Sequence, residues 1–291
     1  MPFDTFRLAP HLGLFAPGPG LFSQSAGLDP VEQISVIAVH GFTAITDNFL
    51  LRRPHQEQER IGSALAQRGM AMGSFVATLA FDRATFGSDD PSAVAFLRDS
   101  MREALDAAKR VGGKWLTTIP GLNTAAVASE RQRDIAIANF RRCADEAEKC
   151  GAVLLLEALN GIDRPGMLFP EITEAAEMVR AVNSPACRLV FDVYHVQVQS
   201  GDLMRNIDRC WDEIGYFQIG DNPGRFEPGT GEINFARVLS HIHSRGYRGM
   251  IDMEHKVKGE GAAGESAMLA AYRQLYADAE GFLTTSRKEH S

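Results

Sequence analysis

Cysteine is scarce in this 291-residue sequence. The four cysteines, Cys143, Cys150, Cys187 and Cys210, form no CxxC pair and are too few for a disulfide scaffold. This usage favours a reducing compartment, and we therefore expect a cytoplasmic protein.

Long apolar runs are also missing. No stretch approaches the roughly 20 residues that a membrane-spanning helix needs. The segment MPFDTFRLAPHLGLFAPG at the start has no basic region followed by a continuous apolar one, as a secretion signal would. We therefore expect no association with a membrane.

Positive charge is not in excess. The 30 lysines and arginines are outnumbered by 37 aspartates and glutamates, which gives a formal net charge of -7. No basic surface able to neutralise a phosphate backbone is implied, so we expect no nucleic acid partner. The chain also lacks GxGxxG after the first strand and GxxxxGK followed by Ser or Thr, the usual signatures of nucleotide-binding folds.

What the chain does have is an alternation of short β-type apolar runs with longer amphipathic stretches, the pattern of a parallel sheet covered by helices. We expect eight strands, at His11–Phe15, Phe42–Thr46, Met72–Leu79, Lys114–Ile119, Val153–Glu157, Leu189–Asp192, Tyr216–Ile219 and Gly249–Glu254. Eight strand–helix units fit the length of a closed barrel better than an open doubly wound sheet. The prediction is an α/β fold, a (β/α)8 or TIM barrel, that forms a single domain over residues 1–291.

Two of the intervening helices carry readable start signals. Asp29-Pro30 and Asp90-Pro91 each combine an N-cap residue with a proline in the first helical turn. We expect helices to begin at these two points.

Polar side chains close four consecutive apolar strands. They lie in the segments VLLLEALN, RLVFDVYH, GYFQIGDN and GMIDMEH and are Glu157, Asp192, Gln218 and Glu254. In a barrel these strand ends build the active site. Three carboxylates in one mouth repel each other, and a bound dication is the simplest way to keep them ionised. Ligation by oxygen alone favours Mg²⁺ or Mn²⁺ over zinc, so we predict that these four residues bind one such ion.

The connection after the seventh strand, residues 221–233 (DNPGRFEPGTGEI), is long for a strand-to-helix loop and rich in glycine and proline. Long loops of this kind are usually functional or disordered. Because Arg225, Glu227 and Glu232 are interleaved with the glycines and prolines, we interpret the loop as a charged binding surface. We expect Arg225 and Glu227 to bind the substrate.

Two further side chains follow the predicted metal ligands. His195 comes three residues after Asp192, where it would face the same barrel mouth. Lys256 comes two residues after Glu254 and would either face the mouth or stay solvated. We count both as candidate substrate-binding residues.

The segment from Glu157 to Glu254 resembles the xylose-isomerase-like barrel superfamily and, within it, the hydroxypyruvate isomerase family. FDVYHVQVQSGDL and QIGDNPGRFEPGTGEINF are similar to that family's most specific segments. The resemblance implies that the metal ligands are Glu157, Asp192, Gln218 and Glu254, and that His195 and Arg225 contact substrate oxygens. Related ketose 3-epimerases tend to have His where this chain has Gln218, and they do not usually carry the loop PGRFEPGTGEI in this form.

The chain departs from the family at two places. After Glu254 the family tends to have an aromatic residue, a basic residue and proline, whereas this chain has His255-Lys256-Val257. After the second strand, Thr46-Asp47-Asn48-Phe49 stands where a Glu-Phe segment is expected. Both differences fall at the pocket wall, so they bear on the substrate and not on the metal chemistry.

Residues and resemblance together predict a metal-dependent isomerase that moves a proton next to the carbonyl of a small hydroxy-keto compound through an enediolate. Glu157 and Glu254 would flank this intermediate, with Glu254 favoured as the base. Arg225 is the natural bidentate partner of a substrate carboxylate.

The alternatives within enzymes are a ketose 3-epimerase and an isomerase of a four-carbon 2-oxo acid. An endonuclease of the same superfamily would need a histidine-rich site for several zinc ions and a basic surface. From a different class, the chain could be a non-catalytic sugar-binding barrel. A homo-oligomer is compatible with all of these readings.

Overall fold

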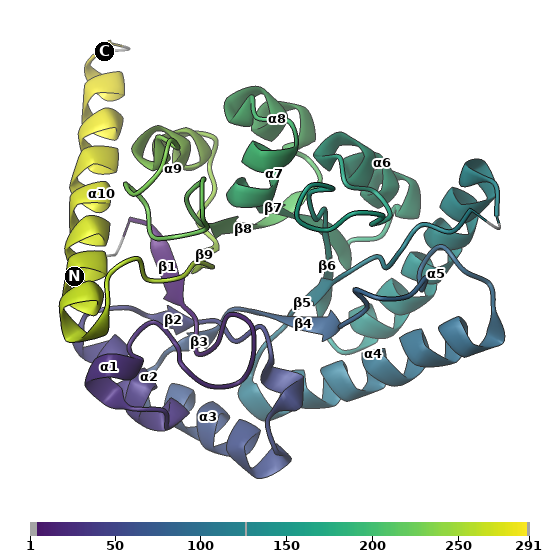
Figure 1. Cartoon of the computed structure of the whole chain (residues 1–291), viewed down its shortest axis with the longest axis horizontal. Helices are drawn as coiled ribbons and strands as arrows, with labels where there is room; N and C mark the ends of the chain where they lie inside the picture. The colour runs from purple at the N-terminus through teal and green to yellow at the C-terminus, as the bar shows by residue number, and fades with distance from the viewer. Residues whose placement is uncertain (1–4, 126, 290–291) are drawn as a thin grey trace.

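The computed structural model describes residues 5–125 and 127–289, and its strands stand side by side in the middle of the molecule (Figure 1). The strands are β1 Arg7–Pro10, β2 Ala44–Ile45, β3 Ala71–Met72, β4 Ser74–Thr78, β5 Trp115–Thr118, β6 Val153–Glu157, β7 Cys187–Asp192, β8 Ile214–Ile219 and β9 Met250–Met253. All their pairings are parallel. The predicted TIM barrel is confirmed.

A sheet of seven strands in the order β1-β9-β8-β7-β6-β5-β4 forms most of the barrel wall. The short pair β2-β3 closes the ring. On one side His11, just after β1, forms a parallel bridge with Thr46, just after β2. On the other side the amide of Asp47 donates to the carbonyl of Ser74, at the start of β4.

The prediction for the first strand is wrong in position. We expected His11–Phe15, but the strand is β1 at Arg7–Pro10 and the expected segment turns over the barrel mouth. Leu12 and Leu14 are buried in this turn and Phe15 is exposed, so alternating apolar residues meet the core without an extended backbone. Gly13 makes the turn possible, because a Cβ there would lie 2.3 Å from the carbonyl oxygen of Ala16.

The third predicted strand, Met72–Leu79, is divided into β3 and β4 at Gly73. A Cβ at this position would lie within 3 Å of the Tyr216 hydroxyl, an Asp252 carboxylate oxygen and the Ile45 carbonyl. The side chains of the barrel interior approach the backbone closely here, and only glycine leaves room for them.

A ring of helices surrounds the strands (Figure 1). The helices are α1 Ser23–Ala26, α2 Pro30–Val39, α3 His55–Arg68, α4 Pro91–Val111, α5 Ser129–Lys149, α6 Ile172–Val182, α7 Val193–Gln199, α8 Leu203–Cys210, α9 Phe235–Ser244 and α10 Gly261–Glu289, with a 3₁₀ turn η1 at Leu50–Arg52. Both predicted start signals are confirmed. The Asp29 carboxylate accepts from the amides of Val31 and Glu32, and the Asp90 carboxylate accepts from the amide of Ser92.

The alternation of side chains along the strands divides the core into two regions. Along β7, Leu189 and Phe191 pack in the large cluster under the helices, whereas Val190 packs in a smaller one inside the barrel. A polar layer lies above this inner cluster: the Asp252 carboxylate accepts hydrogen bonds from the hydroxyls of Thr46, Ser74 and Tyr216. The strand ends above this layer carry the predicted site.

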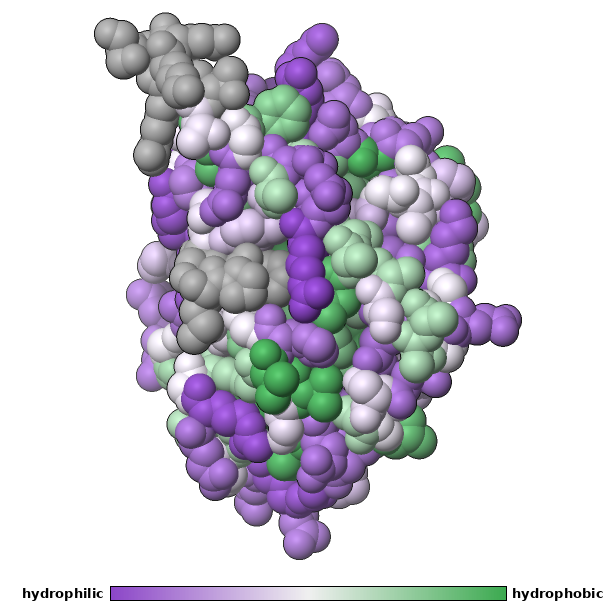
Figure 2. Space-filling model, turned by 90° about the vertical axis from the view of Figure 1, so that its left-hand side faces the viewer, coloured by the Kyte–Doolittle hydropathy of each residue, from purple (hydrophilic) through white to green (hydrophobic). Residues whose placement is uncertain are grey.

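On the side that carries α10, the outer surface is largely hydrophilic, with apolar residues in separate groups (Figure 2). Within the described residues, no helix combines the length and the apolar character that a bilayer crossing requires.

Gly62 provides a test of the helix ring. It lies where α3 meets α4, and a Cβ there would be 2.1 Å from the carbonyl oxygen of Arg110. Alanine is the better helix former by about 1 kcal/mol, but Gly62→Ala must push the two helices apart. We expect a net destabilisation of about 1–3 kcal/mol in urea unfolding.

The matched control is Ser63→Ala, because Ser63 is exposed on the same helix. It should change the free energy of unfolding by no more than about 0.5 kcal/mol. A Gly62→Ala variant more stable than the wild type would show that α3 and α4 do not pack as described.

Candidate functional site

The four predicted metal ligands lie at neighbouring strand ends inside the barrel mouth. Glu157 ends β6, Asp192 ends β7, Gln218 is near the end of β8, and Glu254 directly follows β9. All four are buried. Asp192 and Gln218 are partners in the register of β7 and β8, and parallel partners point to the same side of a sheet. The structure therefore brings the predicted side chains to one place.

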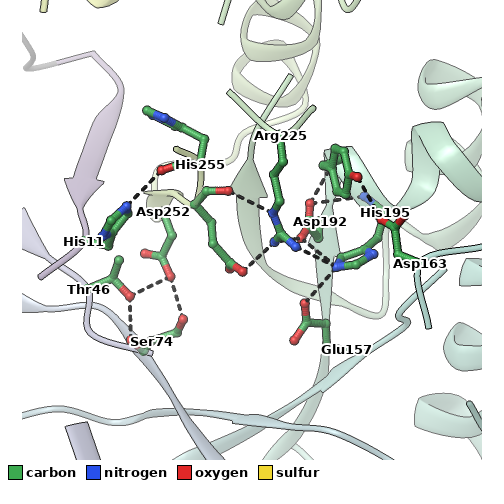
Figure 3. Close-up of polar contacts among 12 residues, drawn as sticks. His11, Thr46, Ser74, Glu157, Asp163, Asp192, His195, Arg225, Asp252 and His255 are labelled. Atoms are coloured by element: carbon green, nitrogen blue, oxygen red, sulfur yellow. Dashed lines mark hydrogen bonds and ion pairs between the residues drawn. The ribbon is translucent and has the colours of Figure 1, made fainter. Parts of the chain in front are cut away.

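Arg225 reaches into this group from the loop after β8 (Figure 3). Its Nη2 donates to Asp192 Oδ2 at 2.7 Å and to Glu254 Oε1, and its Nε donates to the Glu254 carbonyl at 3.1 Å. The guanidinium also stacks over the Tyr194 ring, 4.9 Å from its centroid. Arg225 is thus the counter-ion that links two of the three carboxylates.

The loop that carries Arg225 is organised around the buried carboxylate of Asp221. This carboxylate accepts from the amides of Asn222, Gly229, Gly231 and Ile233 at 2.8–3.1 Å. The loop is therefore ordered and not merely flexible, despite its glycines and prolines.

The backbone of Arg225 itself has a φ of 55°, a left-handed conformation that is uncommon for residues other than glycine. Two hydrogen bonds hold it there: its amide donates to the Asp221 carbonyl, and its carbonyl accepts from the Lys256 amide, both at 2.8 Å. The surrounding structure thus fixes the position from which the guanidinium enters the site.

Burial makes the acidic cluster costly to ionise. Burial raises the pKa of Glu157 well above its usual range, and the charges of Glu254 and Asp192 raise it further. Burial also raises the pKa of Asp192, and it raises that of Glu254 to about 8, although Arg225 opposes both shifts. One guanidinium therefore does not neutralise three carboxylates fully.

His195 is buried beside the cluster and is held by Asn160. The backbone amide of Asn160 donates to Nδ1 of His195 at 3.2 Å, and the Asn160 side-chain amide lies 2.7 Å from the same nitrogen. The Asn160 Oδ1 accepts from the Asp163 amide, which turns its NH2 group toward the imidazole. Burial and the charge of Arg225 lower the pKa of His195, so the ring is neutral. With Nδ1 as acceptor, its proton lies on Nε2.

The donors present fit a hard divalent cation. Glu157, Asp192 and His195 offer ligand atoms that lie within 4.8 Å of one another. Two further buried oxygens, Gln218 Oε1 and Glu254 Oε2, have no hydrogen-bond partner in the described part of the chain. Buried oxygens are rarely left unpaired, and carboxylate and amide oxygens are what Mg²⁺ and Mn²⁺ prefer. This group could hold a metal ion.

Asp252, below the cluster, accounts for the orientation of Gln218. The two residues are register partners on β8 and β9, and the Gln218 side chain hydrogen-bonds the Asp252 carboxylate. Since a carboxylate accepts, the NH2 group of Gln218 faces Asp252, and its oxygen Oε1 is left without a hydrogen-bond partner among the described residues. Burial raises the pKa of Asp252 to about 7, although four side-chain hydrogen bonds oppose the rise.

A cavity of about 330 Å³ opens above the acidic cluster. Its lining combines the charged site residues with an apolar wall: Leu14, Phe15, Asn48, Phe49, Arg52, Val76, Leu79, Phe81, Ile119, Glu157, Leu159, Arg164, His195, Arg225 and Glu254. The volume is within the range of small-molecule sites.

Two of the predicted substrate-binding residues do not line this cavity. Glu227 is buried beneath the loop, where its carboxylate accepts from the Lys258 amide at 2.9 Å. Lys256 is exposed, with its ammonium 4.4 Å from the centroid of the Phe226 ring. Glu227 and Lys256 thus connect neighbouring segments of the chain. Of the charged residues predicted to bind substrate in this region, only Arg225 contacts the acidic cluster in the described structure.

Sequence reasoning did not select Asn48, Asn160 or Arg164 as site residues. Asn48 lines the cavity beside Glu254 and lowers the pKa of its carboxyl group, and Asn160 orients His195. A signal existed for the two asparagines, because each follows a barrel strand by three residues, at β2 and β6. Arg164 lies further along the loop after β6, where no spacing rule applies.

Asp221 gives a test of how the loop is held. Asp221→Ala would leave four backbone amides without their acceptor, and we expect a loss of stability on the order of 2 kcal/mol. The amides of residues 229–233 should exchange with deuterium faster than in the wild type.

Glu232→Ala is the control, since Glu232 lies on the same loop but is exposed, and its carboxylate accepts from the side chains of Asn222 and Gln197 and from no loop amide in the described residues. Its amide exchange should resemble that of the wild type. Equal exchange in the two variants would contradict the central role of Asp221.

Comparison with known sequences finds relatives of this chain. The chain is 32% identical over 167 residues to hydroxypyruvate isomerase of Escherichia coli K12, a match that covers 57% of this chain and 65% of the relative. It is 27% identical over 248 residues to 2-oxo-tetronate isomerase of Cupriavidus necator, which covers 84% of this chain and 92% of the relative. The chain thus spans just under two thirds of the first relative and most of the second.

Solved structures share the fold. A protein described as AP endonuclease, family 2, from Brucella melitensis aligns with a TM-score of 0.78 and 26% identity, covering 92% of this chain and 99% of that one. The 3-keto-D-glucoside 4-epimerase of E. coli aligns with a TM-score of 0.75 over 94% of this chain and 99% of that one, at 18% identity, which shows the fold alone. A model of the xylose isomerase-like TIM barrel family matches residues 34–274. The chain therefore belongs to the xylose isomerase-like TIM barrel family.

Proposed function

We propose that this chain is a divalent-metal-dependent isomerase of a small hydroxy-keto acid, with Mg²⁺ or Mn²⁺ as the ion. One observation carries the proposal: the buried carboxylates of Glu157, Asp192 and Glu254 lie at neighbouring strand ends, and two of them, Glu157 and Glu254, line one cavity. Within the described residues, two buried oxygens of this group, Gln218 Oε1 and Glu254 Oε2, have no hydrogen-bond partner. Such a cluster is costly unless a cation shares it.

The relatives support the reaction and the substrate class. Both are named as isomerases of small oxo acids, hydroxypyruvate and 2-oxo-tetronate. The four-carbon acid is the substrate named for the relative whose alignment covers 92% of its length. The endonuclease name of the Brucella protein does not carry over, because this chain is acidic and its site is rich in oxygen donors.

The four strand-end residues Glu157, Asp192, Gln218 and Glu254 would hold the ion. Bound there, a divalent cation supplies positive charge that favours the enediolate form of a hydroxy-ketone. His195 is a substrate-binding residue and not a ligand in this proposal, because Asn160 donates to its Nδ1 and its Nε2 therefore carries the proton.

Glu254 and Glu157 divide the proton transfer between them. Glu254 Oε2 has no hydrogen-bond partner in the described residues, so it is placed to take the proton from the carbon beside the carbonyl. Glu157, in the protonated form that its raised pKa favours, would give its proton to the former carbonyl carbon. The hydroxyl proton passes to the former carbonyl oxygen, and the two glutamates then regain their starting protonation by exchange with solvent. Asn48, which lines the same cavity, lowers the pKa of Glu254 and so opposes part of the rise caused by burial.

His195 and Arg225 orient the substrate. The Nε2–H of His195 is a donor for a substrate oxygen. Arg225 Nη1 lies 3.0 Å from that nitrogen, and since a guanidinium only donates, two N–H groups face each other in this tautomer. We infer that Arg225 shifts from His195 when an acceptor oxygen comes between them.

The test is the Glu254→Gln variant, assayed with hydroxypyruvate and 2-oxo-tetronate in D₂O. Glutamine keeps an oxygen for the ion but cannot accept a proton, so turnover should fall roughly a thousandfold. Wild-type turnover should require Mg²⁺ or Mn²⁺, stop with EDTA, and place deuterium on the carbon next to the carbonyl. The control is Glu148→Gln, because Glu148 is exposed on α5, away from the site.

An active Glu254→Gln variant together with conversion that incorporates no deuterium would rule out this proton transfer, because a hydride shift carries the substrate's own hydrogen. Wild-type protein that binds the acids but never converts them would favour the non-catalytic sugar-binding barrel.

A further inference from the structure

The cavity above the site has two unlike sides. One side holds the charged group of Glu157, His195, Arg225 and Glu254. The other side is apolar, with Val76, Ile119 and Leu159 packed together and Leu79 and Phe81 against them. Two arginines, Arg52 and Arg164, interrupt this apolar lining.

Both arginines are exposed residues of the cavity lining, and each stacks over an aromatic ring. The guanidinium carbon of Arg52, at the end of η1, lies 4.9 Å from the centroid of Phe49. That of Arg164, in the loop after β6, lies 4.9 Å from the centroid of Phe81. Phe49 and Phe81 line the same cavity. A stacked guanidinium keeps its edge N–H groups free to donate.

Neither guanidinium has an anionic partner of its own. Within residues 5–125 and 127–289, no carboxylate oxygen lies within 4.0 Å of a side-chain nitrogen of Arg52 or Arg164. The neighbouring Arg53 is the contrast: it is buried and pairs with Asp47, so its role is structural. The guanidinium groups of Arg52 and Arg164 therefore border a substrate-sized cavity with N–H donors that no carboxylate of the described residues uses.

The remaining arginine of the cavity is already engaged. Arg225 uses Nε and Nη2 on Glu254 and Asp192. A substrate carboxylate bound there would displace contacts that neutralise the buried acidic cluster. Arg52 and Arg164 offer the same bidentate geometry without that cost.

We propose that Arg52 and Arg164 form a carboxylate-binding subsite, and that the substrate is a hydroxy-keto acid longer than three carbons. The inference rests on the proposed function. The carbonyl and hydroxyl of such an acid lie at the acidic cluster, and its carboxylate lies between the stacked arginines.

The size of the cavity agrees with a longer acid. A volume of about 330 Å³ corresponds to roughly eleven water molecules at the density of the liquid. A three-carbon acid would leave much of this space to solvent. The apolar wall of Val76, Leu79 and Ile119 would pack against the carbon chain between the two ends.

The test compares an acid with its neutral counterpart, and neither can be isomerised. D-erythronate and erythritol are titrated by calorimetry into the purified protein, with Mg²⁺ and again with EDTA. In both conditions we expect the acid to bind tighter. Arg52→Gln and Arg164→Gln should each weaken erythronate binding roughly tenfold to a hundredfold, as expected for loss of a hydrogen bond to a charged group, and leave erythritol unchanged.

The matched control is Arg209→Gln. Arg209 is exposed on α8, and its substitution removes the same charge away from the cavity. It should bind erythronate like the wild type, and all three variants should keep the wild-type melting temperature. No preference for the acid, or a preference that survives in both cavity variants, overturns the subsite. Tighter binding of inorganic phosphate than of erythronate overturns the assignment to a carboxylate.

The same measurements separate this inference from the proposed function. An arginine-dependent preference for erythronate without turnover of any keto acid would support the carboxylate-binding subsite and contradict the proposed isomerase activity. Turnover of acids and neutral ketoses at equal rates would support the isomerase activity and contradict the carboxylate-binding subsite.

Discussion

The site depends on how charge is balanced among the buried carboxylates of Glu157, Asp192 and Glu254. Their strands end side by side, so the barrel brings three negative charges together where water is largely excluded. Arg225 forms ion pairs with two of them, Asp192 and Glu254. The loop that carries Arg225 is held by backbone hydrogen bonds to Asp221. Burial raises the pKa of Glu157 and Glu254 in spite of this counter-ion, so the group stays costly to ionise. In the function proposed above, a divalent cation in the same place would complete this balance.

The sequence contained enough to find this cluster because parallel strands impose two simple rules. Side chains alternate across the wall, so the residue two places beyond the inward Leu155 or Val190 is also inward, which points Glu157 and Asp192 into the barrel. The strand ends also meet at one mouth. The same rules bring Gln218 to the mouth beside Asp192. The TIM barrel followed from the same alternation, and the family comparison confirms it.

The features that the sequence did not predict lie in loops, where side chains follow no regular alternation from which their direction could be predicted. The first strand was misplaced because Leu12 and Leu14 are buried in a turn and imitate the alternation of a strand. Glu227 was expected at the substrate, but the chain reverses at Arg225 and the next charged residue points beneath the loop. Arg52 and Arg164 are separated by more than 100 residues, and only the closed barrel brings them to one cavity. Such contacts are set by tertiary packing and not by local pattern.

The most direct test of the account is the position of the ion itself. Crystals soaked in Mn²⁺ should show one anomalous peak roughly 2.0–2.3 Å from oxygens of Glu157, Asp192, Gln218 and Glu254. A peak elsewhere, or no peak at all, would contradict the claim that this cluster is a metal centre.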